Sequence, residues 1–318
     1  MNSSGRIDVH HHVIPEAFTA VMRRRGIKKV AGAELPQWTP ERSIGIMDQN
    51  GIATAILSLS APGVYFGSKS EAVKLARACN ETVAAAQAKY PGRFGLFAVL
   101  PMPITDKACA EATYALDTLK ADGVVLLAST DGHFLGDPRF TELMAELDRR
   151  RAIVFVHPNI HPTSTKIGLD YPGFFVEFLC DTSRATANLI FTGTLERFAN
   201  IRWILSHAGG FVPYIAWRLM LAQGVPELAK NAPKGVLHYL QQLYYDTALS
   251  PSPYALSALL QLVDPSHILF GSDFPFAPDI VISLETQALA DSPVLTPELR
   301  QAIDRENALK LLPAFKAR

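Results

Sequence analysis

The sequence is poor in cysteine, with only three among its 318 residues: Cys79, Cys109 and Cys180. Their number is odd and their spacing is wide, which argues against a framework of paired disulfides and is typical of reduced thiols in the cytosol. None of the three lies in a metal-binding or nucleophile motif. We therefore expect a cytoplasmic protein.

The sequence also lacks an excess of either charge, with 30 Lys and Arg residues against 30 Asp and Glu residues. This balance gives no electrostatic reason to expect binding to nucleic acid or to an acidic membrane. No apolar run approaches the roughly 18 residues that a membrane-spanning helix needs. The first residues, MNSSGRIDV, do not have the basic and then apolar pattern of a signal peptide, and no glycine-rich phosphate loop is present.

Short apolar segments alternate with amphipathic segments along the chain, of which 48% is hydrophobic. We predict strands at residues 7–12, 53–60, 94–101, 123–129, 152–158, 201–208, 243–248 and 267–273. Helical spacing of apolar residues is clear at 70–90, 106–121 and 138–150. Eight such units predict a (β/α)8 TIM barrel. Because no linker, charge block or low-complexity tract divides the chain, we expect residues 1–318 to form one domain.

Three consecutive histidines stand in the first predicted strand, in the run DVHHHVIP. Successive side chains of a strand point to opposite faces, so His10 and His12 should share one face and His11 should occupy the other. His11 is therefore expected to be structural. Two imidazoles at a strand end can bind a metal only if other segments supply further ligands.

Three more polar side chains lie at predicted strand ends: His157 on the fifth strand, His207 on the sixth and Asp273 on the eighth. The carboxyl ends of barrel strands meet at one rim, and closure brings the first and eighth strands together. One histidine at such a position is more often structural, but this set of five side chains indicates a metal site. Imidazole and carboxylate ligands suit zinc, or manganese or iron with more oxygen in the shell.

This pattern of H-x-H after strand one, His after strands five and six and Asp after strand eight resembles the amidohydrolase superfamily. The resemblance covers essentially the whole chain. Members with two metals carry a bridging lysine at the end of strand four, whereas the run VVLLASTDG has no lysine. We therefore expect a mononuclear site. The runs IDVHHHVIP, HAGG and GSDFPF look like the aminocarboxymuconate semialdehyde decarboxylase branch, and longer stretches are similar to its members that decarboxylate 6-methylsalicylate or other hydroxybenzoates.

This resemblance implies one divalent metal ion and no organic cofactor, with zinc as the first expectation and manganese as the alternative. The implied ligands are His10, His12, His157 and Asp273. His207 would act in proton transfer, although its use as a fifth ligand stays open.

The resemblance further implies a metal-dependent, non-oxidative decarboxylase of a salicylate-type or related conjugated acid. Such a reaction needs an acid that protonates the ring carbon bearing the carboxylate, and Asp273 and His207 are the candidates. We favour Asp273 as the donor, with His207 relaying the proton. The alternative is a hydrolase of the same architecture, such as a lactonase, because the same ligand set serves both reactions. A non-catalytic barrel would be expected to have lost a ligand.

Arg218 lies eleven residues after His207, where the resemblance implies an arginine that binds a substrate carboxylate from a neighbouring subunit. This position makes Arg218 a candidate substrate contact and indicates a homodimer or higher oligomer; the alternative is an ordinary charge on a helix surface. A second arginine of that branch is replaced by Ser43, with Arg42 one residue earlier. This difference favours a small aromatic or conjugated substrate with a single carboxylate.

Weaker candidates flank these residues. Phe274 and Phe276 would wall an aromatic ring, or simply pack beside the strand. Asp8 would orient an imidazole, or equally form a salt bridge at the strand end. Asp246, near the end of the seventh strand, would help to shape the floor of the site.

Overall fold

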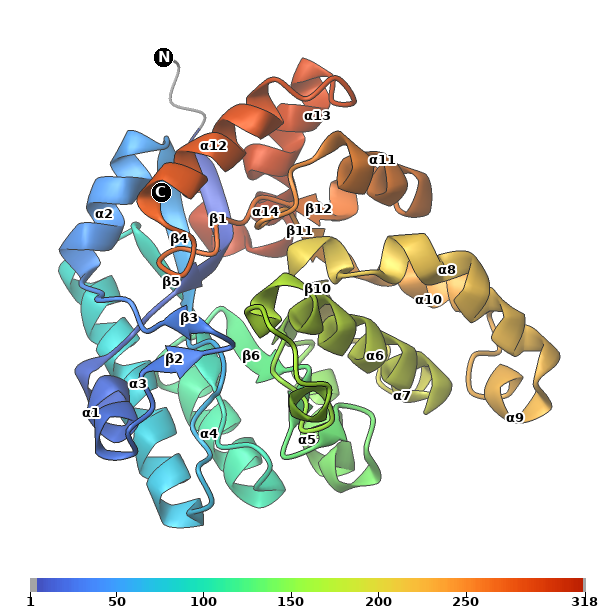
Figure 1. Cartoon of the computed structure of the whole chain (residues 1–318), viewed down its shortest axis with the longest axis horizontal. Coiled ribbons are helices and arrows are strands. Elements are labelled where there is room, and N and C mark those ends of the chain that lie inside the picture. The colour runs from blue at the N-terminus through green and yellow to red at the C-terminus, as the bar shows by residue number, and fades with distance from the viewer. Residues whose placement is uncertain (1–4, 317–318) are drawn as a thin grey trace.

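The computed structural model describes residues 5–316 and contains an eight-stranded parallel sheet surrounded by helices (Figure 1). The strands of this sheet, in spatial order, are β1 (Arg6–His12), β4 (Ile52–Ser58), β5 (Phe94–Val99), β6 (Gly123–Leu127), β9 (Ile153–His157), β10 (Arg202–Leu205), β11 (Tyr244–Asp246) and β12 (Ile268–Leu269). Spatial order follows chain order throughout, as right-handed βαβ units require.

The sheet closes on itself through hydrogen bonds between β1 and the segment that follows β12. The His10 carbonyl accepts a 2.8 Å hydrogen bond from the Asp273 N–H. The His12 N–H donates to the Phe274 carbonyl at 2.6 Å, and His11 and Phe274 form a parallel bridge. The predicted (β/α)8 barrel is therefore confirmed, and its seam lies beside the three histidines.

The helices form a layer outside the strands (Figure 1). They are α1 (Glu16–Arg24), α2 (Pro40–Gln49), α3 (Lys69–Lys89), α4 (Thr105–Asp117), α5 (Thr141–Arg149), α6 (Glu177–Phe191), α7 (Thr194–Arg197), α8 (Val212–Met220), α9 (Pro226–Ala229), α10 (Val236–Gln242), α11 (Pro253–Leu262), α12 (Asp279–Ala290), α13 (Pro297–Gln301) and α14 (Asn307–Leu311). Several begin at a side-chain cap: the Thr39 hydroxyl accepts from the Arg42 N–H before α2, and the Ser68 hydroxyl accepts from the Glu71 N–H before α3. Within residues 5–316, no helix combines the length and apolar character needed to cross a membrane.

The strands are buried on both faces, which explains their nearly continuous apolar runs. In β9 every residue from Ile153 to His157 is buried. Aromatic rings fill the interior of the barrel, where Phe97 stacks on Phe155 with their ring centroids 5.8 Å apart. The Phe155 ring also contacts the His10 ring from below the rim, with 4.9 Å between centroids. The polar rim therefore rests on an apolar barrel interior.

Two excursions from the barrel cover the rim. One is the hairpin of β2 (Lys29–Val30) and β3 (Ala33–Glu34), and the other is the loop 159–176 after β9. They touch each other, because the Phe174 N–H donates to the Ala31 carbonyl at 3.2 Å. A second hairpin, β7 (Ser129–Thr130) with β8 (His133–Phe134), follows β6. The loop after β9 therefore covers the carboxyl ends of the strands.

Candidate metal centre and active site

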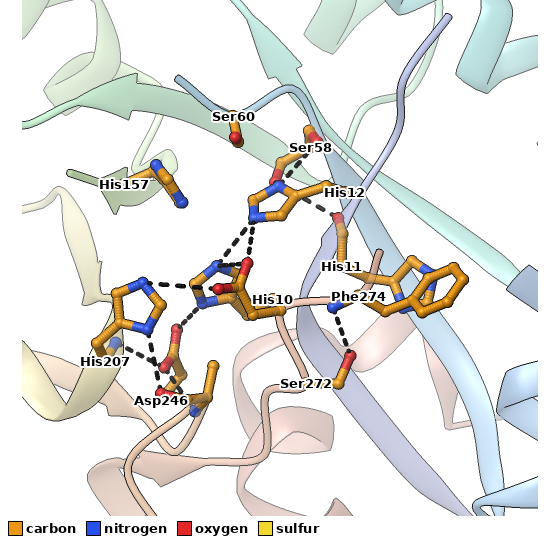
Figure 2. A network of polar contacts seen from close by, with 12 residues as sticks. His10, His11, His12, Ser58, Ser60, His157, His207, Asp246, Ser272 and Phe274 are labelled. Carbon is orange, nitrogen blue, oxygen red and sulfur yellow. Dashed lines mark hydrogen bonds and ion pairs between the residues drawn. The ribbon is translucent and has the colours of Figure 1, made fainter. Parts of the chain in front are cut away.

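The strand β1 presents its histidines to opposite sides, as the alternation of a strand predicts. The Nε2 atoms of His10 and His12 lie 3.0 Å apart inside the rim. His11 points away from them and packs against the Phe274 ring (Figure 2), with 4.9 Å between ring centroids. The register of β1 against β4 shifts between Asp8 and His11. This irregularity lets Asp8 reach the His11 ring three residues along the strand.

The structure brings the four expected ligands together. His10, His12, His157 and Asp273 each offer one donor atom, and these atoms all lie within 4.8 Å of one another. All four residues are buried. The β6 strand, fourth in the barrel, ends at Leu127 and adds no donor to this cluster among the described residues. The four residues together could hold one metal ion.

The three imidazoles are oriented so that their Nε2 atoms face one point. Each Nδ1 contacts an oxygen that only accepts hydrogen bonds: His10 contacts Asp246 Oδ2 at 2.7 Å, His12 the Ser58 carbonyl at 3.2 Å and His157 the Pro158 carbonyl at 2.8 Å. A proton on each Nδ1 satisfies these acceptors, although the Ser58 hydroxyl also lies 3.2 Å from His12 Nδ1. A cation that replaces any proton on the Nε2 atoms would then bind their lone pairs. The donor set thus fits a divalent metal of the zinc or manganese type.

The electrostatics of the cluster also fit a cation. Burial opposes a charged His10, but the negative charges of Asp246 and Asp273 outweigh it and raise the pKa of His10 to about 10. Burial and the neighbouring imidazoles hold the pKa of His157 well below its usual value. Asp273 Oδ1 lies 2.9 Å from His12 Nε2, yet it is buried without a well-formed hydrogen bond in the described structure. The site therefore favours positive charge at the point where the Nε2 atoms meet.

His207 faces this point from the turn that follows β10, and it is not one of the four residues of the cluster. Its Nε2 lies 4.0 Å from Asp273 Oδ2, and its Nδ1 donates to the Ala248 carbonyl at 3.1 Å. Burial, followed by the charge of His10, lowers the pKa of His207, so the ring is neutral with Nε2 free. His207 and Asp273 both have left-handed backbone conformations, with φ of 54° and 59°. Such strain in non-glycine residues costs about 1–3 kcal/mol each and concentrates at functional sites.

A cavity of about 580 Å³ opens above the cluster. Its polar lining consists of His157, His207, Asp273, Ser60 and Ser250. Its apolar lining consists of Val30, Ala33, Phe174, Phe175, Phe178, Leu179, Leu249, Phe276, Ala277, Pro278 and Val281. No lysine or arginine of residues 5–316 is part of this lining. Polar groups are therefore concentrated near the candidate metal position, and the remaining walls are mostly apolar.

Two of the predicted substrate contacts do not line the cavity. The Phe274 ring is fully buried, and it lies against His11 and beneath the Arg42 guanidinium instead. Arg218 is exposed on α8. The neighbouring Phe276 does line the cavity, and its ring centroid lies 5.5 Å from that of His12. Strand alternation would put both side chains on one face, but residues 274 and 276 flank Pro275 and do not continue β12, so their rings lie in different places.

Sequence reasoning missed the apolar walls that the covering loops contribute. Phe174 and Phe178 come from the loop after β9 and from the start of α6, and Val30 comes from the β2 strand. Their only sequence signal is the aromatic run GFFVEF after a proline. The contact of this loop with Ala31 depends on tertiary packing, which the sequence does not reveal.

The family and the relatives of the chain agree with this geometry. The amidohydrolase family pattern matches residues 7–314. A 6-methylsalicylic acid decarboxylase of Penicillium expansum is 36% identical, across 98% of this chain and 97% of that protein. A 6-methylsalicylic acid decarboxylase of Aspergillus aculeatus is 37% identical, across 98% of this chain and 97% of that protein.

Solved structures share the fold. The crystal structure of an amidohydrolase II superposes with a TM-score of 0.90 at 33% identity, covering 97% of this chain and 99% of that chain. A dihydroxybenzoic acid decarboxylase of Polaromonas, solved with manganese and the inhibitor 2-nitroresorcinol, has a TM-score of 0.84 at 23% identity and covers 97% of both chains.

Proposed function

The chain belongs to the amidohydrolase family, and we propose that it is a metal-dependent decarboxylase that removes the carboxyl group of a salicylate-type acid without oxidation. One observation carries this proposal: four donor atoms of His10, His12, His157 and Asp273 meet at the floor of a largely apolar cavity. The relatives that are about 36% identical over nearly the full chain are decarboxylases of this substrate class, which supports a carboxy-lyase rather than a hydrolase.

The four convergent residues would hold the metal ion. Three imidazole nitrogens and one carboxylate oxygen suit zinc, our first candidate, and manganese is the second because a structural neighbour was solved with it. When bound, such a cation supplies positive charge that offsets the carboxylate and the adjacent phenolate of the substrate. All four ligands are buried away from bulk water, which strengthens the attraction between the cation and the substrate anion.

The residues Asp273 and His207 would move the proton. In the reaction one proton is added to the ring carbon that carries the carboxylate, the C–C bond breaks, its electron pair returns to the ring and CO2 leaves. His207 Nε2 lies 4.0 Å from Asp273 Oδ2, so we propose that Nε2 accepts a proton from solvent and passes it to the Asp273 carboxylate, which then delivers it to the ring carbon. The Ala248 carbonyl keeps the His207 proton on Nδ1 and so leaves Nε2 to exchange protons.

The cavity walls indicate which salicylates would fit. The ring would lie among apolar side chains such as Phe178, Phe276 and Val281, which cannot satisfy extra hydroxyl groups. Polar partners are restricted to the floor and to Ser60 and Ser250. We therefore favour a ring with alkyl rather than hydroxyl substituents away from the reacting carboxylate and its neighbouring hydroxyl. This preference agrees with the 6-methylsalicylic acid decarboxylases among the relatives.

We propose that the protein is cytoplasmic and assembles from two or more copies. In such an assembly, Arg218 of one subunit would reach the cavity of its neighbour. Its support is its exposure on α8 beside Tyr214, Trp217 and Leu221, whose large apolar side chains are more than 60% exposed. Contiguous exposed apolar side chains are typical of interaction surfaces. Light scattering of the purified protein tests the assembly, and Arg218→Ala tests the contact through a raised KM for the acid.

The function is tested with metal-stripped and metal-loaded protein and a panel of substrates. The panel contains 6-methylsalicylate, salicylate, 2,6-dihydroxybenzoate and a small lactone, and mass spectrometry follows their consumption. We expect CO2 release from the alkyl salicylate only with the loaded protein. Hydrolysis of the lactone without CO2 release from any acid would replace the decarboxylase with a hydrolase.

A further inference from the structure

The carboxylate of Asp246 binds two other segments of the rim and the backbone of its own segment. It ends β11, is completely buried, and lies beside His10 and His207 (Figure 2). Its Oδ2 accepts the His10 Nδ1–H at 2.7 Å. Its Oδ1 accepts the backbone N–H groups of His207 at 2.8 Å and of Ala248 at 3.0 Å. One side chain therefore contacts an expected metal ligand and the backbone of the expected proton carrier.

A further contact extends the influence of Asp246 to the His207 ring. The Ala248 carbonyl, on the residue whose N–H Asp246 binds, accepts the His207 Nδ1–H at 3.1 Å. Asp246 thus holds the backbone N–H of His207 directly and its ring through Ala248. His207 and the next residue, Ala208, both have φ of 54°, a conformation that needs such external support.

Only a carboxylate satisfies all of these contacts. The His10 Nδ1–H and the two backbone N–H groups are donors, and an ionised aspartate offers acceptors on both oxygens. Asparagine has one acceptor oxygen and one NH2 group, so in either orientation a donor faces a donor. If the NH2 group faces His10, the Nδ1 atom must accept, and its proton moves to Nε2, the atom that faces Asp273.

We propose that Asp246 is a positioning residue that serves both halves of the reaction: it keeps the Nε2 lone pair of His10 available to the cation and holds Nε2 of His207 toward Asp273. The effect on His207 rests on the function proposed above, whereas the effect on His10 does not. Donor atoms of His10, His207 and Asp246 also lie within 4.8 Å of one another. A second metal there is disfavoured because N–H groups already occupy both oxygens of Asp246.

The main test is metal binding by Asp246→Asn in the full chain, with Asp304→Asn as the matched control. Asp304 is another buried aspartate, but it accepts from Arg6 Nε at 2.9 Å at the opposite end of β1. Metal-stripped protein is titrated with Mn²⁺ and with Zn²⁺ by calorimetry. We expect Asp246→Asn to weaken binding about 10- to 100-fold, as loss of a contact behind a histidine ligand does, and Asp304→Asn to bind as the wild type. Equal affinities in the two variants would overturn the proposal.

A second measurement uses the wild-type protein and does not depend on whether the variant folds. Nitrogen-15 NMR of the zinc-loaded protein reports which ring nitrogen of each histidine carries a proton. We expect Nδ1–H on both His10 and His207, and an unprotonated Nδ1 on His10 would overturn the proposal. If these results hold but no acid is decarboxylated, the function proposed above fails while the role of Asp246 toward His10 stands.

Discussion

The inner and outer faces of β1 use the same residue type differently. On the inner face, the His10 ring contacts Asp246 through Nδ1 at 2.7 Å, and its Nε2 lies beside His12 and Asp273. On the outer face, the His11 ring contacts Asp8 through Nδ1 at 2.9 Å, and its Nε2 meets the Ser43 hydroxyl at 3.0 Å. Both imidazoles are fully buried and have a carboxylate behind them.

The two faces differ in whether a ring nitrogen is left to bind a ligand. The outer contacts form a complete chain, because the Trp38 Nε1–H donates to Ser43 Oγ, and Asp8 also accepts from the Ser272 hydroxyl. This chain joins the α2 helix, β1 and the segment after β12, and it has the composition of a Ser-His-Asp triad. Since Ser43 is completely buried, no substrate reaches it. A histidine with structural partners on both ring nitrogens stabilises the fold, whereas histidines whose Nε2 atoms converge with a carboxylate form a candidate metal site.

The largest expected effect is the loss of the metal from the inner face. We predict that His12→Ala abolishes both metal binding and decarboxylation, because it removes one of four convergent donors. Plasma mass spectrometry of purified protein measures the metal content. The matched control is His11→Ala, which should retain the metal. Equal metal loss in both variants would show that the two faces do not differ as described.

The next effect separates binding from proton transfer. We predict that His207→Ala keeps the metal but lowers kcat by about 10²- to 10⁴-fold, the usual contribution of a positioned acid or base. The reason is that His207 Nε2 lies 4.0 Å from Asp273 Oδ2, outside the four-residue cluster. Metal analysis and steady-state kinetics are measured on the same preparation. Loss of the metal would instead make His207 a fifth ligand.

The outer face should affect stability. We predict that His11→Ala lowers the free energy of unfolding by about 3 kcal/mol, since it leaves a cavity and removes buried hydrogen bonds to Asp8 and Ser43. Urea unfolding of the wild type and the variant measures this difference. A change in the free energy of unfolding below about 0.5 kcal/mol would contradict the stabilising role of the hydrogen bonds on the outer face.

A smaller effect concerns Glu285, a buried residue of α12 whose pKa is affected by charged groups on both faces of β1. Burial, together with the charges of Asp273 and Asp8, raises the pKa of Glu285 from 4.5 to about 9. Between these pH values the folded protein holds a proton that the unfolded chain has released. Stability should therefore fall as the pH rises, by at most about 1.4 kcal/mol per unit.

The variant Glu285→Gln is neutral at every pH and should remove this slope. In metal-free protein, we predict that the loss of stability between about pH 6 and about pH 8 shrinks by about 2 kcal/mol. Urea unfolding at the two pH values measures it. An unchanged slope in the variant would mean that Glu285 is ionised in the folded protein.

Much of the barrel was predictable because its strands are buried on both faces and its helices are amphipathic. The predicted helix at 70–90 lies at Lys69–Lys89, but the predicted strand at 267–273 is only Ile268–Leu269. One local reason is that Asp273 has φ of 59°, so the segment after β12 leaves the extended conformation even though the Asp273 N–H still bonds to the His10 carbonyl. Strands end early at the rim because the site imposes its own backbone geometry.

The expected ligands were also identifiable from the sequence, because parallel strands bring their carboxyl ends together. The roles of Asp246 and Glu285 were not, since a buried carboxylate is defined by partners that are distant in sequence. Asp246 was predicted only to shape the floor, and its contact with His10 spans 236 residues. Phe274 illustrates the remaining limit, because one turn after β12 decides which of two phenylalanines reaches the cavity.

The most direct test of the difference between the two faces is anomalous diffraction from crystals grown with Zn²⁺ or Mn²⁺. We predict one peak, in contact with Nε2 of His10, His12 and His157 and with the Asp273 carboxylate. A peak elsewhere, such as beside His11 and Asp8, or no peak with the metal in excess, would contradict the account.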